Sequence, residues 1–177
     1  YDIFVRDRRS PGATERVSVD SAEVEATGGN SIRPAISADG RFVAFESVAS
    51  NLVAGDTNVL SDVFVRDRTL GTTERVSVDS VEAQSTGGRS EAAAISGDGR
   101  LVAFASLATN LVGGDSNFDM DVFLRDRALG ATERVSVNSA EAQATGGFST
   151  SPSISSDGRL VAFQSFATDL VAGDSNG

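Results

Sequence analysis

The stretch ISADGRFVAFESVASNLVAGDTN, residues 36–58, decides the fold because the chain contains it three times. It recurs as ISGDGRLVAFASLATNLVGGDSN at 95–117 and as ISSDGRLVAFQSFATDLVAGDSN at 154–176. The spacing between copies is 59 residues, and the 177-residue chain is three such periods long. A fixed period of this length, with short strand-like runs and no long helical pattern, is typical of small sheets stacked face to face. The sequence therefore predicts a series of blades.

Each repeat predicts four short strands. In the first complete copy these are residues 33–37, 41–47, 62–67 and 74–79. The turn between the first two carries Asp39-Gly40, and Asp-Gly between apolar runs is a strong hairpin signal. The second strand is apolar at consecutive positions, as expected of a strand covered on both faces. Four antiparallel strands per repeat, stacked as blades, predict an all-β fold of the β-propeller type, with three blades per chain.

The fourth strand and the segment that follows it carry two further expectations. In the N-terminal copy Val17 and Val19 alternate with Arg16 and Ser18, which predicts a half-solvated outer strand. The segment SAEVEA at 21–26 then predicts a single helical turn, stopped by the glycines that follow it.

The phase of the repeat predicts how the chain would assemble. The three repeats run over 2–61, 62–120 and 121–177, so the chain is expected to start at a third strand and to finish after a second strand. Three blades fall short of the four to eight that close a propeller. We therefore expect a homodimer that forms one six-bladed ring, in which residues 2–5 and 15–19 of one chain pair with the last strands of the other.

The motifs DGRxVAFxS, DVFVRDR and TERVSV, in this order, resemble the TolB-like propellers of bacteria, also called WD40-like or PD40 repeats. Residues 39–47, 62–68 and 73–78 show one copy of the series, and the resemblance extends over the whole chain. It implies an extracytoplasmic protein, secreted or periplasmic, that carries a propeller.

Composition excludes several classes of function. The net charge of −10 argues against a nucleic-acid surface, and no apolar run approaches the ~20 residues of a membrane span, so we expect neither nucleic acid binding nor membrane insertion. The chain has no histidine and no GxSxG motif, which excludes a Ser-His-Asp hydrolase within it. Nearly every acidic residue recurs in all copies, whereas a catalytic site usually breaks a repeat. We therefore expect no enzyme.

The most distinctive polar motif is the acidic loop between the second and third strands, GDTNVLSD and its copies. Alternate residues of such a loop can direct several oxygens at one hard cation, so the sequence predicts calcium as a cofactor. The candidate ligands are Asp56, Asn58 and Asp62 in the first copy, Asp115, Asn117, Asp119 and Asp121 in the second, and Asp174 and Asn176 in the third, which would share an ion with Asp2 of a neighbouring chain. The alternative is that these residues form Asx turns and strand caps without metal.

Two other residue sets are better explained by structure than by function. The Arg-Asp-Arg triplets, at 6–8, 66–68 and 125–127, predict ion pairs along the blades. The phenylalanines of the second strands predict core packing.

Three functions remain. The first is a non-catalytic scaffold that binds a protein or cell-envelope partner through the loop-rich face. The second is a lectin-like propeller that binds a glycan, disfavoured because the variable loop positions offer only Phe118 and Phe148 as aromatic platforms. The third is an accessory domain of an enzyme.

Overall fold

The computed structural model describes residues 1–9 and 11–174, and within these ranges the chain forms strands and turns and no helix. The strands follow one another in chain order and are short, with three to six residues each. Their bounds are β1 Phe4–Arg6, β2 Thr14–Arg16, β3 Ser31–Ile36, β4 Phe42–Ser47, β5 Asp62–Asp67, β6 Thr72–Arg75, β7 Ser90–Ile95, β8 Leu101–Ser106, β9 Asp121–Asp126, β10 Ala131–Arg134, β11 Ser149–Ile154 and β12 Val161–Ser165.

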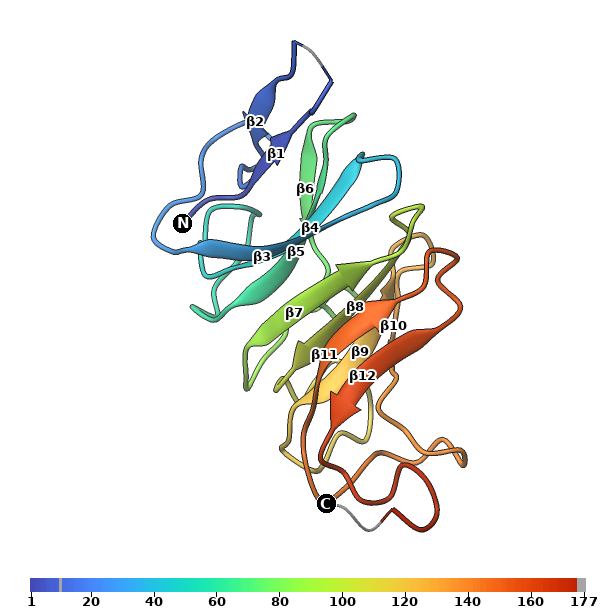
Figure 1. Cartoon of the computed structure of the whole chain (residues 1–177). Helices are drawn as coiled ribbons and strands as arrows, with labels where there is room; N and C mark the ends of the chain where they lie inside the picture. Colours follow the sequence, from blue (N-terminus) through green and yellow to red (C-terminus); the bar gives the residue numbers. More distant parts are fainter. Residues whose placement is uncertain (10, 175–177) are drawn as a thin grey trace.

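The strands form antiparallel sheets in sequence order. Strands β3 to β6 make one four-stranded sheet and β7 to β10 make another. Two two-stranded sheets flank them, β1–β2 and β11–β12. Figure 1 shows the sheets arranged one after another, with β7 and β8 between the β3–β4 hairpin and the β11–β12 hairpin. The predicted all-β architecture of four-stranded antiparallel sheets is confirmed for these two sheets.

The core lies between neighbouring sheets and is built from the apolar second and third strands. In the first sheet Phe45 lies opposite Phe64 on the paired strands, and their ring centroids are 6.0 Å apart. The second sheet repeats this pair as Phe104 and Phe123, at 5.9 Å. All four rings are fully buried, which confirms that the predicted second-strand phenylalanines at 45 and 104 belong to the core.

The Asp-Gly turns form as the sequence predicts. Gly40 has a φ of 74°, a left-handed conformation that glycine adopts without steric cost. Asp39 accepts hydrogen bonds from the Ser37 hydroxyl at 2.7 Å and from the Arg41 backbone amide at 2.9 Å. The same arrangement recurs at the next turn, where Asp98 holds Ser96 and Arg100.

The fourth strands β6 and β10 are half-exposed, as predicted, but the alternation predicted at residues 16–19 is wrong. Strand β2 ends at Arg16, and the residues after it are all buried: Val17 is 1% exposed, Ser18 0% and Val19 6%. Ser18 is covered because its hydroxyl donates to Asp2 and accepts from the Ile3 amide. The face that alternation assigned to solvent is therefore used for hydrogen bonds within the sheet.

The predicted helical turn at 21–26 is also wrong. The Asp20 carboxylate accepts hydrogen bonds from the amides of Ala22 and Val24, both at 2.8 Å, and Glu23 takes a left-handed φ of 64°. Val19 then bridges to Glu25. An aspartate that binds nearby backbone amides competes with helix formation, and Asp79 and Asn138 do the same in the other copies.

No helix long and apolar enough to span a membrane occurs in the described ranges.

Candidate functional site

The two long connections of each repeat lie against each other. The Asn51 side chain accepts a hydrogen bond from the Thr27 amide and donates one to the Glu25 carbonyl, both at 2.8 Å. In the next repeat Asn110 makes the equivalent bonds to Thr86 and Gln84. These asparagines therefore hold the loop between the second and third strands against the loop that follows the preceding fourth strand.

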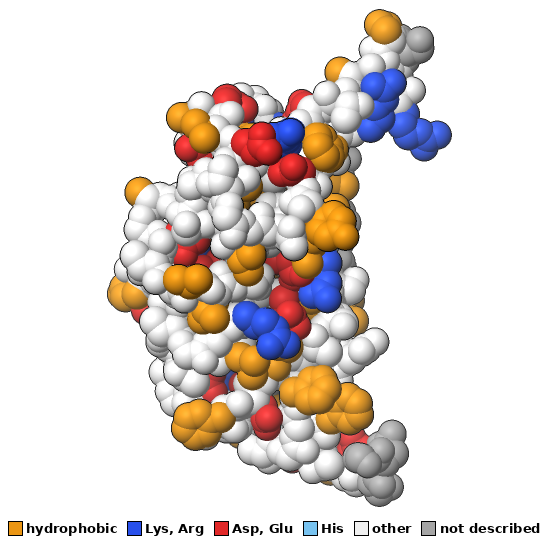
Figure 2. Space-filling view, turned by 90° about the vertical axis from the view of Figure 1, so that its left-hand side faces the viewer, with side chains coloured by type: hydrophobic (Ala, Val, Ile, Leu, Met, Phe, Trp, Pro, Cys, Tyr) orange, Lys and Arg blue, Asp and Glu red, His pale blue; other side chains and the backbone are white. Residues whose placement is uncertain are grey.

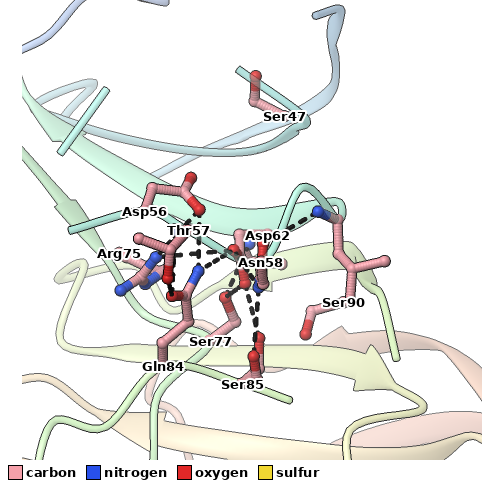
Figure 3. Close-up of polar contacts among 12 residues, drawn as sticks. Ser47, Asp56, Thr57, Asn58, Asp62, Arg75, Ser77, Gln84, Ser85 and Ser90 are labelled. Atoms are coloured by element: carbon pink, nitrogen blue, oxygen red, sulfur yellow. Dashed lines mark hydrogen bonds and ion pairs between the residues drawn. The ribbon is translucent and has the colours of Figure 1, made fainter. Parts of the chain in front are cut away.

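The first acidic loop, residues 56–62, folds into a buried polar cluster (Figure 3). Asp62 accepts hydrogen bonds from the hydroxyls of Ser77 at 2.6 Å and Ser85 at 2.8 Å, and from the Asn58 amide nitrogen at 2.9 Å. Asp56 accepts one from the Gln84 amide nitrogen at 2.8 Å. The structure thus brings Asp56, Asn58 and Asp62 together, as the sequence predicted.

The cluster also contains a cation that the sequence analysis did not assign to it. Arg75, the last residue of β6, places its Nη1 3.4 Å from Asp56 Oδ1 and 3.7 Å from Asp62 Oδ2. Its side chain is 10% exposed, and its Nε and Nη1 are buried without a hydrogen-bond partner. The guanidinium therefore acts as a buried counter-ion for both carboxylates.

The second acidic loop, residues 115–121, repeats the arrangement. Arg134 lies 3.5 Å from both Asp115 and Asp121, and Gln143 donates to the same two carboxylates. Asn117 donates to Asp121 at 3.4 Å and to the Ala144 carbonyl at 3.1 Å. Asp119, the fourth predicted ligand of this loop, is not part of the cluster.

Burial shifts the pKa of one carboxylate in each cluster. It raises the pKa of Asp56, and the neighbouring charge of Asp62 raises it further. Burial also raises the pKa of Asp121, against the lowering effects of the Ser136 hydroxyl and of Arg134. The clusters are therefore places where added positive charge is favourable, which is the role that the arginines fill.

The remaining predicted ligands are at the chain's two extremities. Asp2 accepts a hydrogen bond from the Ser18 hydroxyl at 2.8 Å and lies 4.0 Å from Arg16. Asp174 is the last residue described, and Asn176 lies outside the described residues.

The residue types of the acidic loops suit calcium, and arginine and glutamine side chains occupy the space beside the carboxylates. In the described residues no group of three or more acidic, histidine or cysteine side chains is placed to hold a metal ion. At Asp115 and Asp121 the donors Gln143 and Arg134 already point at the carboxylate oxygens. Calcium binding stays a prediction, and it requires the guanidinium to move away.

This requirement gives a test. We expect Arg134→Met to increase the rise in melting temperature that millimolar calcium produces over EDTA, because the variant leaves two buried carboxylates without a counter-ion. A site filled to a hundred times its Kd stabilises by about 2.7 kcal/mol, and magnesium should replace calcium poorly. The control is Arg127→Met, which removes an arginine that pairs with Glu74 and donates to the Gly99 carbonyl. A calcium response at least as large in the unchanged chain would contradict the expectation.

The Arg-Asp-Arg triplets at 66–68 and 125–127 make the predicted ion pairs, whereas Asp7 of the triplet at 6–8 pairs with the nearby Arg9. Asp67 receives a two-pronged contact from Arg41, with Nη2 to Oδ2 at 2.6 Å, and this contact lowers the pKa of Asp67 to about 2. Arg66 pairs with Glu23, and Arg68 pairs with Glu15. The last two pairs cross from one sheet to the preceding one, so the triplets connect neighbouring blades.

A second feature of the loop-rich side is a cleft of about 400 Å³ between the second sheet and the β11–β12 hairpin. Its wall includes Met120, which is 7% exposed, and Phe148, which is 44% exposed. The Phe148 ring packs on Phe166 with centroids 4.8 Å apart. The lining residues, named here as the interblade cleft, are Arg89, Glu91, Leu107, Asp119, Met120, Phe148 and Thr150.

Charged and apolar groups converge in the interblade cleft. Arg89 pairs with Glu91 at 2.9 Å, while the Asp119 side chain makes no ion pair or hydrogen bond with any other described residue. Leu107, Met120 and Phe148 supply apolar surface beside them. Figure 2 shows basic and acidic side chains side by side in the middle of one face of the molecule, with hydrophobic side chains next to them.

The interblade cleft is formed where the repeats differ. The residues equivalent to Arg89 are Asn30 and Phe148, and those equivalent to Asp119 and Met120 in the first loop are Leu60 and Ser61. Phe148 could be recognised from the sequence as a loop aromatic, whereas the rest of the cleft was not predicted. An alignment of the three copies would have indicated the cleft. Its residues stand at positions where the copies differ, next to strands whose sequences are nearly the same in all three.

No protein-family model matches the chain, and no curated protein matches it. Solved structures do. A prolyl endopeptidase from a study of two such enzymes matches with a TM-score of 0.54 and 13% identity, over 93% of this chain and 22% of that one. The tricorn protease matches with a TM-score of 0.51 and 13% identity, over 89% and 12%. TolB from Acinetobacter baumannii matches with a TM-score of 0.49 and 17% identity, over 92% and 34%.

These likenesses concern the fold alone. The prolyl endopeptidase and the tricorn protease are propeller-type proteins, and the matches to them confirm the propeller fold that the sequence resemblance implied. The chain spans about a third of the length of the TolB structure and smaller shares of the other two.

Proposed function

We propose that the chain is a non-catalytic interaction scaffold that acts outside the cytoplasm and binds a protein partner at the interblade cleft. The observation that carries the proposal is that this cleft, unlike the rest of the stacked sheets, is built from residues that break the repeat. Residues shared by all copies maintain the blades, as the phenylalanine pairs and the Arg–Asp clusters do. A position that is not needed to stabilise the blades is available to bind a partner.

The chemistry of the cleft indicates the kind of partner. Leu107, Met120 and Phe148 offer a surface for an apolar or aromatic side chain, and interface anchors are typically of this kind. Asp119 has no counter-ion among the described residues, and the chain as a whole carries a net charge of −10. A peptide segment with a basic residue next to an apolar one fits both features.

A phage-displayed peptide library selected on the immobilised chain tests the proposal. We expect enrichment of peptides in which arginine or lysine lies beside an aromatic or aliphatic residue. Phe148→Ser should raise the dissociation constant of the selected peptides at least 10-fold, which corresponds to a loss of about 1.4 kcal/mol of binding free energy. Asp119→Asn should lower the affinity for these peptides by a smaller factor and should reduce the salt dependence of binding.

The matched control is Phe118→Ser, which removes an exposed phenylalanine from the neighbouring loop but not from the cleft. Phe118 is 79% exposed, and this variant should bind as the unchanged chain does. A glycan array run on the unchanged chain, Phe148→Ser and Phe118→Ser tests the competing function. Glycan binding that Phe148→Ser abolishes, with no peptide enriched, would replace the scaffold by a lectin-like propeller.

A further inference from the structure

Strand β12 has an open edge whose equivalents in the two complete sheets are covered. In β4 and β8 the last five residues are buried, because β5 and β9 pair with them. In β12 the equivalent five residues alternate between half-buried and exposed. The only neighbour of β12 in its sheet, within the described residues, is β11. An edge of this kind presents unpaired backbone groups and apolar side chains to any strand that can pair with it.

The β1–β2 hairpin has the complementary surface. It carries the sequences of a third and a fourth strand, DIFVRD and TERVSV, and pairs in the register of β5 with β6. Phe4 is 54% exposed, whereas its equivalents Phe64 and Phe123 are fully buried against the phenylalanines of β4 and β8. The hairpin thus exposes the side chain that a second strand would cover.

We propose that the open edge of β12 takes the β1–β2 hairpin of a second copy of this chain, and that two copies close on each other in this way. The register follows from the complete sheets, where Phe45 lies opposite Phe64 and Phe104 opposite Phe123. Transferred to the new pair, it places Phe163 opposite Phe4 of the second copy. Each composite sheet then has four strands, and its two central phenylalanines meet as they do elsewhere.

Charged side chains at the two surfaces match in the same register. Arg68 pairs with Glu15 and donates to the Gly40 carbonyl, and Arg127 repeats both contacts with Glu74 and Gly99. Glu133 is the next member of this series, and its side chain makes no ion pair or hydrogen bond with another described residue. Arg8, the matching arginine, is likewise without one. The second copy brings Arg8 to Glu133 and to the Gly158 carbonyl.

Two further pairs follow the same rule. Arg66 pairs with Glu23 and Arg125 with Glu82, which assigns Arg6 of the second copy to Glu141. Arg41 and Arg100 each donate two hydrogen bonds to an aspartate of the adjacent third strand, Asp67 and Asp126 respectively. Their equivalent, Arg159, has only Asp157 at 3.9 Å and is 75% exposed. In the composite sheet its partner is Asp7, which releases Arg9 to solvent.

Light scattering after size-exclusion chromatography tests the proposal on the chain as it stands. We expect a mass of twice 18.2 kDa. Phe4→Glu should raise the dissociation constant of the pair at least 100-fold, because it places a charge against Phe163. The control, Leu70→Glu, adds the same charge at an apolar side chain that is 68% exposed on a turn and should leave the mass unchanged.

Exchanging the charges of one ion pair distinguishes dimerisation in this register from non-specific association. Arg8→Glu and Glu133→Arg should each weaken the pair several-fold, and the double variant should recover most of the loss. A folded chain of 18.2 kDa at micromolar concentration would overturn the proposal. So would a mass above two chains, or weakening by the single charge variants that the double variant does not repair.

Discussion

Replacing Phe104 by alanine should lower the free energy of unfolding by about 3–5 kcal/mol. The Phe104 ring is fully buried in the middle of the second sheet and packs on Phe123 at an angle of 28°. It belongs to the core cluster that also holds Val63 and Val102, so its removal leaves a cavity between two sheets rather than on one. Urea unfolding followed by circular dichroism, at one fixed protein concentration, measures the loss.

The control for Phe104→Ala is Phe118→Ala, because the Phe118 side chain is 79% exposed. This substitution should lower the free energy of unfolding by less than about 0.5 kcal/mol. Because domains of this kind are stable by only about 5–15 kcal/mol, the core variant should approach the limit of folding. Equal effects of the two variants would mean that the sheets do not pack on each other through these rings.

Asp62→Ala should also cost about 3–5 kcal/mol, because several buried hydrogen-bond donors lose their acceptor. Asp62 is fully buried, and its loss removes the acceptor of the Ser77, Ser85 and Asn58 donors. Arg75 then keeps only Asp56 as counter-charge inside the cluster. Each of these buried donors that is left without an acceptor costs about 1–3 kcal/mol.

The comparison variant for Asp62→Ala is Asp39→Ala, which removes an aspartate from an exposed turn where it holds Ser37 and Arg41. A cost of about 1 kcal/mol is expected there. Thermal melts of both variants give the difference. If Asp62→Ala proves no more harmful than Asp39→Ala, the acidic loop is not an organised cluster.

The strands and their turns could be predicted from the sequence because their signals are local. Apolar runs such as VAF at 43–45 and the Asp-Gly turns act through neighbouring residues, and the structure places β4 and β5 within one residue of the expected ranges. The segment after β2 was predicted incorrectly, because the Asp20 side chain outcompetes the helical hydrogen bonds there.

The site was less predictable because its parts come from separate segments. The proximity of Asp56, Asn58 and Asp62 follows from one loop, but Arg75 reaches them from the end of β6, where strand alternation alone assigned the equivalent Arg16 to solvent. The interblade cleft combines segments around residues 90, 120 and 148. Only the packing of one sheet on the next brings these segments together.

A saturation mutagenesis scan that measures folding and peptide binding separately is the most direct test of the proposed function. It asks whether the residues that bind the peptide are those at which the three repeats differ. The displayed chain is sorted once with a conformation-sensitive probe and once with the best selected peptide. We expect substitutions at Phe148 to remove peptide binding and substitutions at Asp119 to weaken it while folding stays intact. Substitutions at repeated positions such as Phe104 should remove both folding and binding. Binding losses without folding losses that cluster away from the interblade cleft, or that fall equally on all three copies, would contradict the proposed function.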